Sequence, residues 1–144
     1  KEEDADELFQ QHIEAQCKRL RILGFTGTPI IRGNLNAMDK SLLPSLQTVC
    51  TEILNNIAKH GKPGAFAFIL SVGPDAVRIF ASNLYNAAIN SAPENHYGTA
   101  LIQDFAQQHN GTMTINSENE EWSLSLTIPL AHQVKLMFSP TEKL

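Results

Sequence analysis

The clearest periodic pattern of apolar residues lies between Ser41 and His60. Apolar side chains recur there at steps of three and four residues, the spacing of one face of an α-helix. These positions are Leu42, Leu46, Val49, Cys50, Ile53 and Ile57. Pro44 falls in the first turn, where a missing N–H costs little, and Gly61 follows as a stop signal. The pattern predicts a long amphipathic helix over residues 41–60.

Weaker patterns predict further helices and a sheet. Helical spacing is present in residues 4–21, through Leu8, Ile13, Ala15 and Leu20, and in residues 99–109. Apolar runs predict strands at residues 22–25, 30–32, 65–72, 77–81, 113–116 and 122–130. The first two are expected to flank a turn and the later ones to form hairpins. We therefore expect an α+β fold, a two-layer sandwich whose mixed, mainly antiparallel sheet is covered on one face by helices.

The chain length and composition fit one globular domain. Hydrophobic residues make up 42% of the 144 residues and charged residues 18%. We assign residues 22–138 to the domain proper. Residues 1–21 form an N-terminal helix, whose abrupt acidic start also fits the end of a longer linker or dimerisation helix. Cys17 and Cys50 both fall inside predicted helices, which favours reduced thiols in a core over a disulfide.

The charge balance narrows the classes of partner. A formal net charge of −4 argues against nucleic acid, because phosphate backbones favour basic faces. No apolar run approaches the roughly 20 residues of a membrane span, and no signal peptide opens the sequence. The domain is therefore expected to be soluble, with no membrane contact of its own.

A polar stripe on the 41–60 helix is the first candidate for chemistry. Glu52, Asn56 and His60 are spaced four residues apart and span about 80° of the helix surface. One interpretation is a solvated helix face. The other is a wall that orients water, a hard cation and phosphate oxygens. Asn55 and Asn56 adjoin in a helix interior, where asparagine is unfavourable, and this favours the second interpretation.

Two motifs resemble those of the histidine-kinase-type ATPases, the GHKL superfamily. Residues 51–61, Thr-Glu-Ile-Leu-Asn-Asn-Ile-Ala-Lys-His-Gly, look like the N box, in the form closest to the nitrate- and desaturase-type sensor kinases. Residues 98–102, with the helix and glycine turn that follow, resemble the G2 box, and Ile128-Pro129 resembles the end of the last strand. In that family the asparagine binds a magnesium ion that bridges the ATP phosphates, and the neighbouring glutamate and basic residues act on the phosphate tail.

The resemblance implies a Bergerat-type sandwich and a set of site residues. It implies Glu52 as the catalytic carboxylate and Asn56 as the ligand of Mg²⁺. It implies ATP contacts from Asn56, Lys59, His60, Ser82, Asn83, Gly98, Thr99, Ala100 and Leu101. The implied cofactors are ATP and Mg²⁺, and the implied partners are a phosphoacceptor and dimerisation domain of the same parent protein and, indirectly, a response regulator. The implied location is the cytoplasm, as the cytosolic part of a membrane-associated bacterial sensor.

The sequence departs from the family pattern mainly at the end that binds adenine. Ser82-Asn83-Leu84 stands where the G1 box has Asp-x-Gly, which places Ser82 at the aspartate that accepts a bond from the adenine amino group. His96 replaces the first G2 glycine, and Glu121-Trp122 replaces a Gly-Thr pair. Trp122 is interpreted as a core or edge aromatic, with stacking on a base as the alternative.

Three functions therefore stay open. The first is the ATP-binding catalytic domain of a sensor histidine kinase, which phosphorylates a histidine on a separate domain. The second is a degenerate pseudokinase that acts as a regulatory interaction module, and the third is an anti-sigma-type serine kinase. His12 lies too near the N box to be a phosphoacceptor on a two-helix hairpin and is interpreted as a surface histidine.

Overall fold

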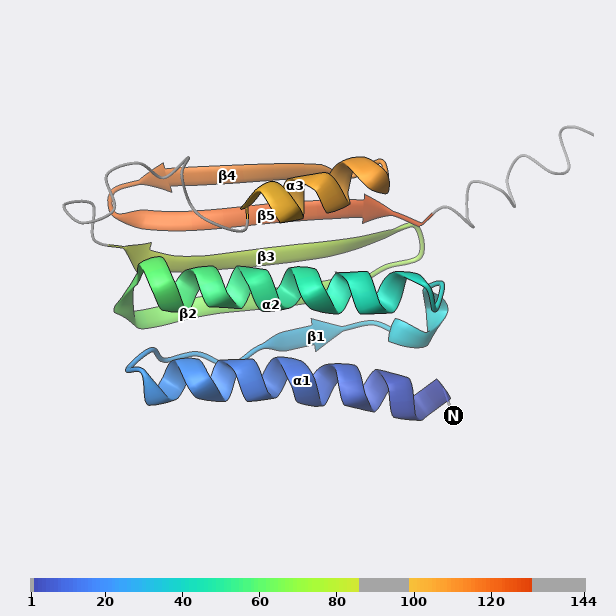
Figure 1. Cartoon of the computed structure of the whole chain (residues 1–144), viewed down its shortest axis with the longest axis horizontal. Helices are drawn as coiled ribbons and strands as arrows, with labels where there is room; N and C mark the ends of the chain where they lie inside the picture. The colour runs from blue at the N-terminus through green and yellow to red at the C-terminus, as the bar shows by residue number, and fades with distance from the viewer. Residues whose placement is uncertain (1, 86–98, 131–144) are drawn as a thin grey trace, which may run out of the picture.

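The computed structural model of the chain describes residues 2–85 and 99–130, with side chains from residue 6 onward. Its strands form a five-stranded sheet in the order β1-β2-β3-β5-β4, and helices lie on one face of it (Figure 1). The strands are β1 (Ile30–Arg32), β2 (Gly61–Val72), β3 (Ala76–Tyr85), β4 (Thr112–Glu118) and β5 (Glu121–Pro129). The helices are α1 (Glu2–Ile22), α2 (Leu42–His60) and α3 (Thr99–Gln108), with a short 3-10 helix, η1, at Leu35–Ala37.

The sheet is mixed and mainly antiparallel, as expected. β1 pairs with β2 in parallel, whereas the β2–β3, β3–β5 and β4–β5 pairs are antiparallel. Alternate residues of β3 and β5 are buried under the helices, and the residues between them lie on the uncovered face. A single position along a strand therefore decides whether a side chain faces the helices.

The predicted 41–60 helix is confirmed as α2 and lies at the centre of the helical layer. It packs on β2 and β3 through its apolar side, with α1 on one flank and α3 on the other (Figure 1). Leu46, Cys50 and Ile53, on this apolar side of α2, are fully buried. The two predicted hairpins, β2–β3 and β4–β5, and the helix α3 are also confirmed.

Helix α1 belongs to the same hydrophobic core as α2. Its buried side chains are Phe9, Ile13, Cys17 and Leu20, which confirms Ile13 and Leu20 from the apolar pattern, whereas Leu8 and Ala15 are exposed. His12 is half-buried and lies 2.7 Å from the Thr51 hydroxyl on α2, so the expectation of a surface histidine is wrong. No helix of the described chain is both long and apolar enough to cross a membrane.

The predicted strand at residues 22–25 is wrong. α1 continues to Ile22, whose side chain is exposed, as is that of Leu23. The chain then turns through Gly24, which has a φ of 102°, and makes only an isolated bridge from Thr26 to Ala65. The prediction failed because Ile22 and Leu23, two residues of this apolar run, face solvent. β1 pairs with β2 and not with the segment that precedes it in the sequence.

The burial of α1 predicts a position-dependent loss of stability. Ile13→Ala removes a side chain with no exposed surface and is expected to lower the free energy of unfolding by about 2–5 kcal/mol. Leu8→Ala is the control, because Leu8 is 63% exposed and its truncation should change the free energy by no more than about 0.5 kcal/mol. Urea denaturation of both variants measures the difference. Equal effects would contradict the packing of α1 into the core.

The two cysteines are free and buried, as the sequence predicts. Burial, with a smaller contribution from the Glu14 carboxylate, raises the pKa of the Cys17 thiol to about 11. Burial also raises the pKa of Cys50. Iodoacetamide at pH 8 should therefore alkylate Cys17 at least about a hundredfold more slowly in the folded chain than in urea, because the thiolate is the nucleophile. Similar rates in the two conditions, measured by mass spectrometry, would contradict this burial.

Candidate functional site

Two neighbouring asparagines of α2 have opposite environments. Asn55 lies on the flank toward α1, where its side-chain oxygen accepts a hydrogen bond of 3.3 Å from Arg19. Asn56 lies on the other flank and is only 5% exposed. Its side-chain nitrogen is buried and has no hydrogen-bond partner among the described residues. The contact with α1 explains Asn55, whereas no hydrogen bond among the described residues satisfies the side-chain nitrogen of Asn56.

A small cavity lies against Asn56, at the place where α2 passes directly into β2. Its lining residues are Asn56, His60, Gly61, Asn83, Tyr85 and Trp122. The cavity volume is about 10 Å³, roughly the space of one water molecule. Asn56 and Asn83 are the two buried polar residues of the described chain, and both line this cavity. Buried polar groups thus converge on one point of the molecule.

The structure brings Asn83, and not Ser82, to this cavity. Asn83 is 4% exposed and faces the helices, as do Ala81 and Tyr85 on either side of it. Ser82 pairs with Ala67 and Ser123 on the uncovered face of the sheet. Ser82 therefore does not reach the cavity, because a shift of one residue along a strand reverses the face on which a side chain lies. Asn83 places a carboxamide where Ser82 was expected to place a hydroxyl.

Gly61 permits the close approach of α2 to β3. A Cβ atom at this position would overlap the side-chain nitrogen of Asn83 and the carbonyl oxygen of Ile57. The Asn83 amide, which donates a hydrogen bond of 2.6 Å to the Leu84 carbonyl, can therefore lie directly against the end of α2. Gly61, the predicted stop of the helix, therefore also determines how closely α2 and Asn83 approach each other at the cavity.

The remaining predicted site residues lie around this point at different depths. Glu52 is half-buried, one turn before Asn56 on the same flank, and Lys59 is exposed and outside the cavity lining. α3 begins at Thr99, which is half-buried, whereas Ala100 and Leu101 are exposed. A groove of about 470 Å³ between α2 and α3 is lined by Thr48, Val49, Leu101 and their neighbours. The predicted residues Gly98 and His96 lie outside the described residues.

Tyr85 and Trp122 line the cavity but were absent from the predicted site. Both are buried, and Trp122 lies opposite Asn83 in the β3–β5 register. The alternation of the two strands carries the necessary signal, because Asn83 and Tyr85 share a face with Ala81, and Trp122 shares one with Leu124.

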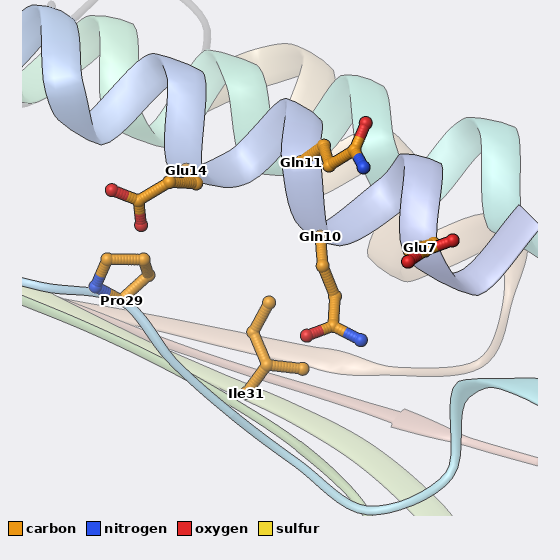
Figure 2. Close-up of a pocket in the computed structure, with 6 residues that line it drawn as sticks. All are labelled: Glu7, Gln10, Gln11, Glu14, Pro29 and Ile31. Carbon is orange, nitrogen blue, oxygen red and sulfur yellow. The ribbon is translucent and has the colours of Figure 1, made fainter. Parts of the chain in front are cut away.

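A wider hollow has a different character. It lies between α1 and β1, has a volume of about 680 Å³ and is open to solvent (Figure 2). Its lining residues are Glu7, Gln10, Gln11, Glu14, Pro29 and Ile31. All four polar side chains are exposed, so none has lost its water. The small cavity at Asn56 is the better candidate site, because its polar groups are desolvated.

Solved structures that are similar to this chain include histidine kinases and the catalytic domain of one of them. The nucleotide-free catalytic domain of histidine kinase ThkA matches with a TM-score of 0.64 at 12% identity, over 87% of this chain and 93% of that one. The blue-light activated histidine kinase of Erythrobacter litoralis EL346 gives 0.63 at 12% identity, over 84% and 41% of the two chains. Histidine kinase AdeS of Acinetobacter baumannii gives 0.63 at 10% identity, over 89% and 64%.

These likenesses confirm the fold that the sequence motifs implied. The chain has the fold of histidine-kinase catalytic domains and spans nearly all of the ThkA domain. It spans less than two thirds of the EL346 and AdeS chains. No protein-family model matches the sequence, and no curated protein matches it. The site therefore rests on the geometry of this chain.

Proposed function

We propose that this domain is the ATP-binding catalytic domain of a two-component sensor histidine kinase. It binds Mg-ATP and transfers the γ-phosphoryl group to a histidine on a separate phosphoacceptor domain. The observation that carries the proposal is the desolvated pair Asn56 and Asn83, which line one cavity between α2 and the sheet of a histidine-kinase fold. A response regulator and a cytosolic location at a membrane-associated sensor belong to the same proposal.

The residues around Asn56 fit a magnesium-bound phosphate tail. A carboxamide oxygen is a ligand type that Mg²⁺ accepts, and this ion keeps most of its waters or takes phosphate oxygens, so one or two protein ligands suffice. Among the described residues, no cluster of three or more His, Cys, Asp or Glu side chains could bind a metal. The ion neutralises phosphate charge when bound. Asn56 would hold it, with Glu52 one turn away on the same flank.

The start of α3 supplies a second contact for phosphate. The first N–H groups of a helix have no partner within the helix and attract anions. α3 begins at Thr99 and runs for ten residues along the flank of α2 that carries Asn56. Phosphate oxygens between α2 and the start of α3 would therefore meet a carboxamide on one side and backbone donors on the other.

Asn83 belongs to the end of the site that would contact the base. Its carboxamide can accept a hydrogen bond from an exocyclic amino group, but it carries no charge. A hydrogen bond to an ionised acceptor is roughly twice as strong as a neutral one. We therefore expect weaker adenine binding than a carboxylate at this position would give.

A degenerate regulatory module is the second candidate, and one observation favours it. The cavity at Asn83 holds roughly one water molecule, because Tyr85 and Trp122 close it. A domain that keeps the fold and binds no nucleotide would serve as an interaction module. Calorimetric titration with a non-hydrolysable ATP analogue, with and without magnesium, separates the two: a folded domain that releases no heat of binding selects the second.

Asn56 and Asn55 give a matched pair of variants for this proposal. Asn56→Ala is expected to abolish magnesium-dependent binding of the ATP analogue, because it removes the proposed ligand from the cavity. Asn55→Ala should bind normally, because Asn55 contacts Arg19 on the opposite flank. Calorimetry on both variants measures the affinities. Equal losses, or loss in Asn55→Ala alone, would contradict the assignment.

The corrected strand position gives a second matched pair. Asn83→Asp provides a charged acceptor in the cavity and is expected to tighten binding of the ATP analogue by about fivefold. Ser82→Asp places the same carboxylate on the uncovered face and should leave the affinity unchanged. Titrations of the two variants compare them directly. A gain in Ser82→Asp with none in Asn83→Asp would show that Ser82 is the base contact after all.

A further inference from the structure

Trp122 occupies the floor of the candidate site. It lies opposite Asn83 on the neighbouring strand, faces the helices and is 3% exposed. Side chains opposite one another in an antiparallel pair have Cβ atoms about 4.5–5.5 Å apart, so the indole is a direct neighbour of the Asn83 amide. With Asn56 and His60 from α2, Trp122 encloses the cavity.

The volume of the cavity decides between two roles for this indole. A platform for stacking would leave a gap beside the ring for a flat base. The structure leaves about 10 Å³ among these side chains, which is roughly one water molecule and far less than a purine. The indole itself is a flat, fused two-ring system, the same general shape as a purine. It therefore fills the space beside Asn83 and offers no free face to a base.

We propose that Trp122 is a built-in occupant of the base-binding part of this site, and that a purine nucleotide binds fully only when the indole leaves. This rests on the proposed function. The open state of this gated site, in which the indole has left, is then a minor state. The apparent affinity for the nucleotide equals the affinity of the open state multiplied by the fraction of molecules that are open. Minor states in proteins are commonly populated at about 0.1–10%, so opening the site permanently should strengthen binding about tenfold or more.

The test replaces the indole and measures the affinity for a non-hydrolysable ATP analogue with magnesium. Trp122→Thr removes the rings and should bind at least about tenfold more tightly than the native chain. Leu124→Ala is the control, because Leu124 is buried on the same face of β5, two residues on, and does not line the cavity. Leu124→Ala also weakens the hydrophobic core, but it should bind the ATP analogue with the affinity of the native chain. If Trp122→Thr does not fold, Trp122→Phe, with one ring fewer, should give an intermediate gain.

The outcomes separate this proposal from the proposed function. Tighter binding by Trp122→Thr than by the native chain supports the gate. If the variant binds and the native chain does not bind at all, the gate is supported and native ATP binding is overturned. Equal affinities overturn the gate and leave the proposed function standing. No binding by either folded protein overturns both.

The native chain offers an independent readout. Trp122 is its only tryptophan, so its fluorescence reports on this side chain alone. Saturation with the nucleotide should shift the emission to longer wavelength, because the indole moves from a buried position toward water. An unchanged emission maximum at saturating nucleotide would overturn the displacement.

Discussion

The candidate site depends on a buried side-chain amide nitrogen, that of Asn56, which has no hydrogen-bond partner among the described residues. Leaving such a group unsatisfied costs about 1–3 kcal/mol, a sizeable part of the 5–15 kcal/mol that keeps a domain folded. Asn56 carries this cost toward the C-terminal end of α2, a helix whose other buried side chains are apolar. Asn55 shows what a structural asparagine looks like in the same helix, since its amide binds a side chain of α1. This contrast supports the proposed role of Asn56 as a ligand contact.

The position of Asn56 follows from the way α2 is held on three sides. The apolar side of α2 packs on β2 and β3, and α1 holds one flank through buried apolar side chains and through polar contacts at Thr51 and Asn55. The third side, with Glu52 and Asn56, is thereby turned toward the start of α3 and the cavity. α1 therefore helps to orient the site although it contributes no residue to the cavity lining.

The sequence was sufficient for the elements with strong periodicity. α2 has apolar residues at regular helical steps and a clear glycine stop, and the hairpins have polar turns between apolar runs, so both were predicted correctly. The strand at residues 22–25 was not, because exposure cannot be read from apolar character: Ile22 is 76% exposed. The parallel pairing of β1 with β2 depends on tertiary packing, which no local pattern contains.

The site was predicted in part for the same reason. The helical spacing of Glu52, Asn56 and His60 predicts a polar wall on one flank of α2, and Asn56 and His60 line the cavity. The motif pattern places Ser82 at the G1 aspartate, with Asn83 as a further implied ATP contact, because the predicted strand ends at Ala81, whereas β3 continues to Tyr85. Extending the alternation of Val77, Ile79 and Ala81 by one step would have placed Asn83 on the inner face. The alternation along β5 places Trp122 on the inner face with Leu124, but its position opposite Asn83 depends on the register between β3 and β5, which only the folded sheet provides.

The most direct test of the account observes the two carboxamides themselves. In a ¹H–¹⁵N correlation spectrum, the side-chain amide signals of Asn56 and Asn83 can be followed while a magnesium-bound, non-hydrolysable ATP analogue is added. The account predicts that both signals shift together with the nucleotide concentration, while the amide signal of Asn55, on the opposite flank of α2, stays in place. Signals of Asn56 and Asn83 that remain unchanged at saturating nucleotide would contradict it.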